Sequence, residues 1–147
     1  NNVELHRFTF PRQAKDDGLS LADYVALNGD NIAMFVVTVG EGVREESEKL
    51  KQSGRYFESH ALQALALECA EAYAEYLHST IRSGWGFPDP VDMTMMERFQ
   101  AKYHGKRYSF GYPACPRLDD QEGLFKLLNP SPDIKVELTE GFMMDPE

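Results

Sequence analysis

Residues 106–116, KRYSFGYPACP, combine an arginine with small residues and alternating aromatics. In a strand, the period of two would place the aromatic rings on one face and Arg107, Ser109 and Gly111 on the other. On that second face, a cation lies beside positions with almost no side chains. A ligand carboxylate or phosphate could therefore approach the main chain closely. The pattern is equally typical of a twisted edge strand with a bulge at Gly111, so both interpretations stay open at this point.

A row of carboxylates is the second feature that could contact a ligand. Glu68, Glu71 and Glu75 recur at three- and four-residue spacing within a helical pattern, so they share one side of a helix. Such a row is usually a solvated face. Glu71, however, lies between Ala70 and Ala72, which leave room for a ligand to reach its carboxylate, so we select Glu71 as a candidate site residue.

Familiar catalytic and metal motifs are missing from the sequence. It has no GxSxG, HExxH, Walker loop or metal-spaced His/Cys cluster, so we predict neither a catalytic side chain nor a metal. For His78 a packing or capping role is favoured over a ligand role. A dinucleotide loop at Gly40-x-Gly42 is rejected, because Glu45 replaces the third glycine and the neighbouring carboxylates would repel a pyrophosphate.

Composition narrows the class of protein. The chain has 147 residues, 42% of them hydrophobic and 12% aromatic, as expected of one folded domain. Fifteen basic against 24 acidic residues give a net charge of −9, which argues against nucleic acid and anionic membrane as partners. Cys69 and Cys115 form no CxxC or disulfide framework, so a reducing cytoplasm is predicted.

The elements that must position these side chains alternate between helices and strands. We expect a capped helix from Ser20 and further helices at residues 41–52, 59–83, 94–103 and 119–128. We expect strands at residues 32–40, 107–112 and 134–138, with another strand opening in 139–147. The strand at 32–40 should pair with 107–112 or with 134–138.

The long helix should be central, with Ser59 as its N-cap and Gly84 just beyond its end. It carries a wide apolar stripe of Leu62, Leu65, Ala66, Cys69, Tyr73, Tyr76 and Leu77.

The R-x-x-x-G-Y signature of Arg107, Gly111 and Tyr112, followed by PACP, resembles the activation domain of cobalamin-dependent methionine synthase. The segments LADYVA, FVVTVGEGV, ALQALALECAEAYAEYLH, WGFPDP and VELTEGFMMDP resemble that domain too, in the same order over nearly the whole chain.

The resemblance implies an α+β fold, a C-shaped single domain in which a twisted antiparallel sheet is flanked by helices. It implies that this domain binds S-adenosylmethionine in a shallow groove and serves a methyltransferase whose cobalamin is held by another domain of the same chain. Reductive methylation would return inactive cob(II)alamin to methylcobalamin, with the electron supplied by a flavodoxin-type reductase. No general base is needed for this transfer.

The resemblance also assigns roles to residues. Arg107 would bind the methionyl carboxylate through its fork, and Glu71, at the family's acidic helix position, would pair with cationic parts of the ligand. Ser109 and Gly111 would add little side-chain bulk to the strand face, so that the ligand can reach the main chain. Tyr112 would turn toward the sulfonium or the corrin. Ala114 completes the predicted ligand-binding set. The simpler alternative for Arg107 is a structural ion pair with an acidic neighbour such as Glu71.

Two other functions remain open from the sequence. One is a docking module that covers the cobalamin domain without binding S-adenosylmethionine, and the other is an independent small-molecule methyltransferase, against which the missing nucleotide-binding glycines argue. Because the family's domain is considerably longer, we expect residues 1–147 to be a single activation domain truncated at both ends.

Overall fold

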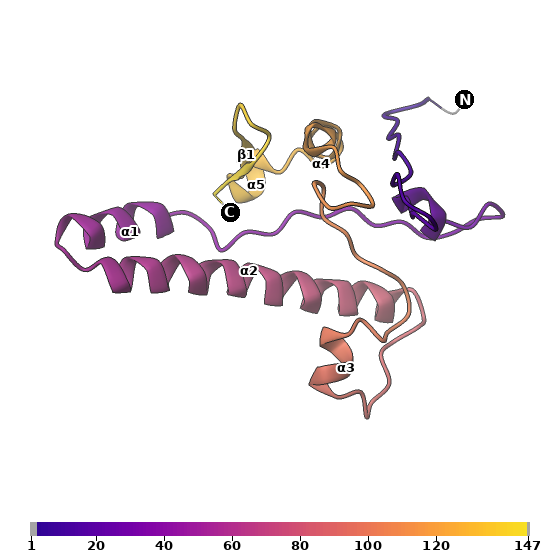
Figure 1. Ribbon diagram of the computed structural model, residues 1–147, viewed down its shortest axis with the longest axis horizontal. Coiled ribbons are helices and arrows are strands. Elements are labelled where there is room, and N and C mark those ends of the chain that lie inside the picture. The colour runs from indigo at the N-terminus through magenta and orange to yellow at the C-terminus, as the bar shows by residue number, and fades with distance from the viewer. Residues whose placement is uncertain (1–2, 147) are drawn as a thin grey trace. The chain divides into compact units, whose positions relative to one another are not determined.

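The computed structural model describes residues 3–146, in which helices are joined by irregular segments and accompanied by one small sheet (Figure 1). The helices are η1 (Leu21–Tyr24), α1 (Val43–Gln52), α2 (Tyr56–Gly84), α3 (Met95–Phe99), η2 (Leu118–Asp120), α4 (Gln121–Leu128) and α5 (Ser131–Ile134). The strands are β1 (Glu137–Leu138) and β2 (Met144–Asp145). These elements form two compact units. Unit 1 comprises the described residues 3–6, 34–74 and 121–146, and unit 2 comprises residues 7–33 and 75–120.

Short-range capping signals start two helices of unit 2. Ser20 precedes η1, its hydroxyl accepts from the Ala22 amide, and the Asp23 carboxylate accepts from the Ser20 amide. Thr94 and Glu97 form the same reciprocal pair at the start of α3. Both predicted starts are confirmed, although the first helix is of the 3₁₀ type and the second ends at Phe99.

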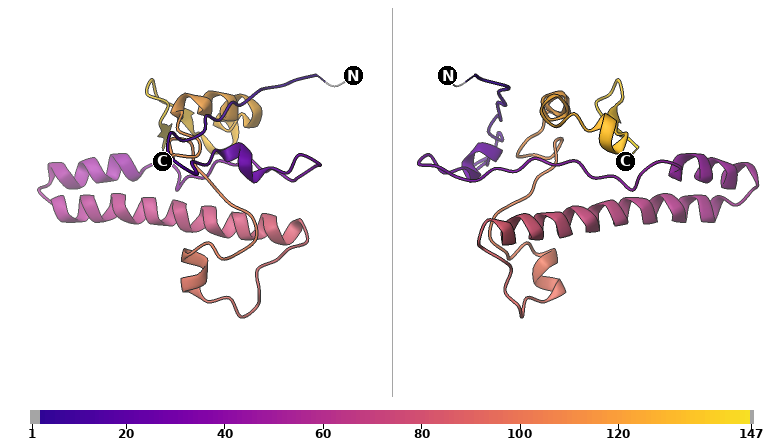
Figure 2. Two further views of the ribbon diagram at one scale, coloured as in Figure 1. Left: turned by 45° about the vertical axis from the view of Figure 1, so that its right-hand side comes forward. Right: turned by 180° about the vertical axis from the view of Figure 1, so that it is seen from behind.

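The start of α2 differs from the prediction. The helix begins at Tyr56, so Ser59 lies inside its first turn and is not the N-cap. Its buried hydroxyl lies 2.7 Å from the Ser47 hydroxyl of α1, and the Gln63 side-chain amide donates to Ser47 at 2.7 Å. These polar contacts join α1 and α2, which lie side by side and antiparallel in all views (Figures 1 and 2).

The predicted apolar stripe of α2 is not its most buried side. Leu65, Tyr73 and Tyr76 are all more than half exposed. The buried positions in the second half of the helix are Ala74, His78 and Arg82, which recur every four residues. Arg82 can occupy this side because its Nε and Nη2 both donate to the Asp89 carboxylate. None of the helices in the described residues is both long and apolar enough to cross a membrane.

The sheet is antiparallel, as predicted, and the fold is α+β, but the described residues form only one two-stranded ladder. Glu137 pairs with Asp145 and Leu138 with Met144, so strands form within the predicted segments 134–138 and 139–147. Residues 32–40 and 107–112 belong to no strand, so the expected pairing of 32–40 with 107–112 or with 134–138 is wrong for the described residues. A β-branched run favours an extended backbone, but a strand also needs a hydrogen-bonded neighbour, which sequence pattern does not supply.

Candidate functional site

The R-x-x-x-G-Y segment ends in a tight turn. The Gly111 amide donates to the Cys115 carbonyl at 2.9 Å, and the Cys115 amide donates to the Tyr112 carbonyl at 2.9 Å. Pro113 occupies the second position of this turn, for which its fixed φ is suited. Gly111 has a φ of 92°, in the left-handed region that favours glycine. The segment is therefore a turn that projects the Tyr112 side chain, which is 60% exposed.

Ser109 and Ala114 contribute main-chain groups to this turn. The Ser109 carbonyl accepts from the Cys115 thiol at 3.0 Å, and burial raises the pKa of that thiol. Ala114 is buried, and its carbonyl accepts from the Leu21 amide at 2.8 Å, which ties the turn to the start of η1. Small side chains at these positions leave the main chain accessible to its partners.

The three alternating aromatics do not share one apolar surface. Phe110 stacks on Phe8, with ring centroids 5.8 Å apart. Tyr108 packs against Tyr24 and donates its hydroxyl proton to the Tyr24 oxygen at 2.7 Å. Burial, followed by this hydrogen bond, raises the pKa of Tyr108 to about 12. Two of the aromatics therefore anchor the segment within unit 2, and Tyr112 remains at the surface.

Replacing Gly111 with alanine is expected to lower the free energy of unfolding by about 1–2 kcal/mol, because a Cβ strains a left-handed backbone. Steric overlap adds little, since the new Cβ would lie 3.5 Å from Leu118 Cδ1, an ordinary contact. Thermal unfolding followed by circular dichroism measures the change. Gly84→Ala is the matched control, because Gly84 ends α2 with open space around it and should lose no stability. Equal stability of the two variants would show that the turn tolerates a side chain.

Arg107 lies at the edge of a network of charges. Its Nη2 is 3.7 Å from Glu75 Oε2, which is an ion pair longer than a hydrogen bond. The same Glu75 oxygen accepts from the Tyr103 hydroxyl at 3.0 Å. The side chains of Arg107 and Glu75 are both partly exposed, at 22% and 28%, so solvent screens their attraction. Arg107 thus has an ion pair with Glu75, which lies one helical turn after Glu71.

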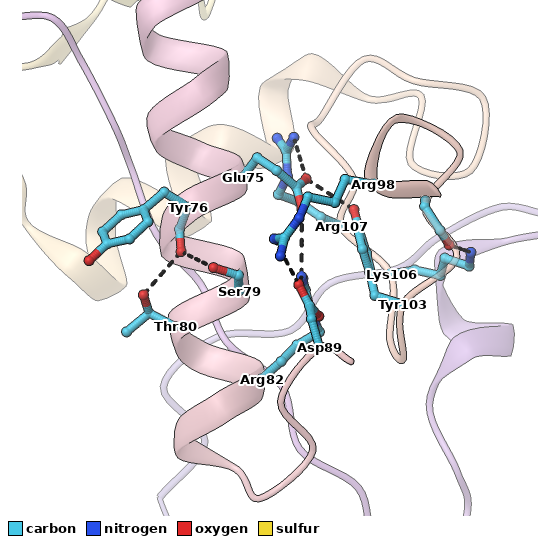
Figure 3. Close-up of polar contacts among 11 residues, drawn as sticks. Glu75, Tyr76, Ser79, Thr80, Arg82, Asp89, Arg98, Tyr103, Lys106 and Arg107 are labelled. Carbon is cyan, nitrogen blue, oxygen red and sulfur yellow. Dashed lines mark hydrogen bonds and ion pairs between the residues drawn. The ribbon is translucent and has the colours of Figure 1, made fainter. Parts of the chain in front are cut away.

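A buried arginine holds this network together. Arg82 Nε and Nη2 donate to the two carboxylate oxygens of Asp89, each at 2.8 Å, and Arg98 reaches the same carboxylate at 3.0 Å. The Arg82 guanidinium also lies 3.7 Å from the centre of the Tyr103 ring. Its Nη2 is 3.6 Å from Glu75 Oε1. Figure 3 shows these side chains converging beside α2. We call Glu75, Arg82, Asp89, Arg98 and Arg107 the charged cluster.

The charged cluster contains three guanidinium groups and two carboxylates, so it has one positive charge in excess. The hydrogen bond from Arg82 is the main cause that holds the pKa of Asp89 below its usual range. Burial, followed by the hydrogen bond to Glu75, raises the pKa of Tyr103, which keeps its hydroxyl protonated at neutral pH. The cluster can therefore attract an anionic group such as a carboxylate.

His78 packs against this cluster from within α2. Its ring meets the Tyr103 ring edge-on at a centroid distance of 5.3 Å, so the predicted packing role is confirmed. Burial is the main cause that lowers the pKa of His78, and the positive charge of Arg82 acts in the same direction. The imidazole is neutral at physiological pH. Among the described residues, no group of three or more His, Cys, Asp or Glu side chains is placed to hold a metal ion.

The structure places five of the six predicted site residues in unit 2: Arg107, Ser109, Gly111, Tyr112 and Ala114. Glu71 lies on α2 in unit 1, where it is exposed, and its contact with a ligand stays a prediction. Sequence analysis missed the partners of Arg107 within unit 2. Glu75 was named only as part of a carboxylate row. No motif or spacing in the sequence indicates that Arg82 pairs with Asp89, because that pairing depends on the path of the loop between them.

A groove in unit 1 contains none of the six predicted residues. It has a volume of about 530 Å³ and is lined by the start of α1 and the β1–β2 hairpin. Arg44 in its wall pairs with Asp145 at 2.6 Å, and Lys135 pairs with Glu41 at 2.7 Å. An anionic ligand would have to compete with both ion pairs. The charged cluster in unit 2 is the candidate site for a carboxylate because it contains Arg107 of the R-x-x-x-G-Y segment.

Comparison with protein families gives a match over residues 2–147 to the vitamin B12 dependent methionine synthase activation domain. Among individual proteins, the chain is 30% identical to methionine synthase of Mycobacterium leprae (strain TN) and 31% identical to that of Mycobacterium tuberculosis (strain ATCC 25618 / H37Rv). Each alignment covers 97% of this chain and 13% of the relative, so the chain spans about one eighth of the length of these enzymes.

Comparison with solved structures gives a related result. The chain is similar to a crystal structure of the MetH reactivation domain bound to AdoHcy, with a TM-score of 0.69 and 31% sequence identity. The match covers 74% of this chain and 34% of that one.

Proposed function

Because the chain belongs to the family of vitamin B12 dependent methionine synthase activation domains, we propose that it binds S-adenosylmethionine for the reactivation of a methionine synthase. In that reaction, inactive cob(II)alamin on another domain undergoes reductive methylation to methylcobalamin. The whole protein is then a methyltransferase, and the residues described here form its site for the methyl donor.

The observation that carries the proposal is the position of Arg107 in the charged cluster. Arg107 begins the family signature that ends in the tight turn, and its guanidinium belongs to a network of three guanidinium groups and two carboxylates. The methionyl part of S-adenosylmethionine ends in a carboxylate, whose two oxygens match the planar fork of an arginine. The AdoHcy bound to the similar reactivation domain carries the same carboxylate, which supports this choice of ligand.

The other predicted residues have roles that follow from their environment. Gly111 and Ser109 contribute main-chain groups to the turn and are assigned to contacts with the ligand, and Ala114 fixes the turn by its hydrogen bond to Leu21. Tyr112 is exposed at the turn and is assigned to the sulfonium end of the ligand or to the corrin. Glu71 is assigned to cationic parts of the ligand.

The protein's task in this chemistry is alignment. Cobalamin held by another domain would supply the nucleophile for the methyl group, once a flavodoxin-type reductase had supplied one electron. The residues of this chain bind the donor and orient its sulfonium methyl, and the leaving group is S-adenosylhomocysteine. Because a sulfonium methyl transfers without removal of a proton, none of these residues needs to act as a general base.

The same proposal includes the surroundings of the domain. We assign the cobalamin-binding domain of the same chain and the reductase as partners, and the cytoplasm as the location. The two compact units are assigned to a single C-shaped activation domain whose twisted sheet includes more strands than the described residues form.

A labelling experiment on the intact protein tests the proposed function. Protein with its cobalamin in the cob(II) state is mixed with S-adenosylmethionine that carries a labelled methyl group, with and without a low-potential chemical reductant. We expect the label on protein-bound cobalamin only when the reductant is present. Failure of transfer in a protein that still makes methionine would support the docking module. Transfer to a small molecule without cobalamin would support an independent methyltransferase.

A further inference from the structure

Glu75 connects the partly exposed Arg107 with Tyr103 and the buried Arg82. One carboxylate oxygen, Oε2, accepts from the Tyr103 hydroxyl at 3.0 Å and lies 3.7 Å from Arg107 Nη2. The other oxygen, Oε1, lies 3.6 Å from Arg82 Nη2. The carboxylate is therefore held from one side by Tyr103 and Arg82, and it faces Arg107 on the other (Figure 3).

The two groups that hold Glu75 are themselves fixed. The Arg82 side chain is 1% exposed and is bound by both oxygens of Asp89. The Tyr103 ring contacts the Arg82 guanidinium and lies nearly perpendicular to the His78 ring. The orientation of the Glu75 carboxylate is thus set by packed and hydrogen-bonded groups, although Glu75 itself lies near the surface.

From this arrangement we infer that Glu75 and Tyr103 are positioning residues, which hold the Arg107 guanidinium in the orientation that receives the ligand carboxylate. The inference rests on the proposed function, since it assumes that Arg107 binds such a group. An arginine side chain has about 2 kcal/mol of rotamer entropy to lose, and a partner that restricts it before binding reduces that cost. A charge of opposite sign at 3.7 Å provides this restriction.

Removing the charge of Glu75 would give an ambiguous result. A Glu75→Gln variant would lose the restraint on Arg107, but it would also lose a negative charge that repels the ligand carboxylate. Variants that conserve charge avoid this conflict. Tyr103→Phe keeps the ring beside Arg82 and removes only the hydroxyl that orients Glu75. Glu75→Asp keeps the carboxylate and withdraws it from Arg107 by one methylene.

The test compares two ligands by calorimetric titration of the intact protein. One is S-adenosylhomocysteine, and the other is S-adenosyl-3-thiopropylamine, which is the same molecule without the carboxylate. For both variants we expect binding of S-adenosylhomocysteine to weaken about three- to tenfold, a part of the value of one charge-assisted hydrogen bond. Binding of the decarboxylated ligand should stay within about twofold of the wild type, as expected of surface changes that do not touch it. Tyr56→Phe and Glu68→Asp, at exposed positions of the same helix, are the matched controls.

Each remaining outcome contradicts the inference in a different way. If both ligands weaken equally, Glu75 and Tyr103 have a structural role only. If neither ligand weakens, they do not position Arg107. If the wild-type protein binds neither ligand, the result contradicts both the proposed function and the inference. A wild type that binds S-adenosylhomocysteine together with unaffected variants would overturn the inference alone.

Discussion

Replacing Arg107 with alanine is expected to weaken binding of S-adenosylhomocysteine about 10- to 150-fold, the value of one charge-assisted hydrogen bond of 1.5–3 kcal/mol. The stability of the fold should change little, because Arg107 is partly exposed and its ion pair with Glu75 is longer than a hydrogen bond. Glu75 also keeps the Tyr103 hydroxyl and Arg82 as partners after the substitution. Titration of the intact protein, alongside a thermal melt, measures the two quantities.

Two further variants separate a bidentate contact from simple charge. Arg107→Lys should not restore the affinity, because an ammonium cannot reproduce the planar fork. Arg117→Ala removes the same charge from unit 2 at an exposed position paired with Asp119, and its affinity should match the wild type. Unchanged affinity of Arg107→Ala together with a lowered melting temperature would show that Arg107 is structural.

Replacing Asp89 with alanine is expected to lower the free energy of unfolding by about 3–5 kcal/mol, the cost of leaving a buried charge without its partner. Arg82 is almost fully buried, and Asp89 supplies both of its short hydrogen bonds. Urea unfolding of the 147-residue chain measures the loss through the fluorescence of Trp85, its single tryptophan, which lies in unit 2. Asp92→Ala, at an exposed position of the same loop, should change stability by less than about 0.5 kcal/mol.

The contribution of Asp89 also has a defined pH dependence. Its pKa is lowered in the folded chain, so the unfolded chain binds the proton more readily. The stabilisation is therefore fully present above the unfolded carboxyl pKa of about 4 and is lost as the pH falls through the lower folded value. The difference between wild type and Asp89→Ala should shrink in that acidic range. A difference that stays constant there would show that Asp89 acts through packing and not through charge.

Helix positions were largely predictable because their signals are local. The reciprocal caps at Ser20 with Asp23 and at Thr94 with Glu97 lie within three residues, so the sequence alone reveals them. Ser59 has the same chemistry, yet its hydroxyl bonds to Ser47 of the preceding helix. Whether a serine caps its own helix or contacts another depends on packing, which a local pattern does not contain.

Strands and charge partners were less predictable because they depend on residues far apart in the sequence. Residues 32–40 have strand composition, but pairing requires a neighbour with compatible register. Glu71 and Glu75 share one helix side by periodicity, so spacing cannot tell which of them meets Arg107. The ion pair of Arg107 with Glu75 depends on the path of the loop that carries Tyr103 and Arg107, which helical spacing does not contain. The signature Arg107, Gly111 and Tyr112 was recognised, but the network behind it was not.

The central claim is that the activation domain binds the S-adenosyl ligand through its carboxylate, and one calorimetric titration tests it most directly. The intact wild-type protein is titrated with S-adenosylhomocysteine, which is not consumed, and then with its decarboxylated analogue. The account predicts saturable one-to-one binding of S-adenosylhomocysteine and binding of the analogue weaker by at least about tenfold. Equal affinity for the two ligands, or no binding of either, would contradict it.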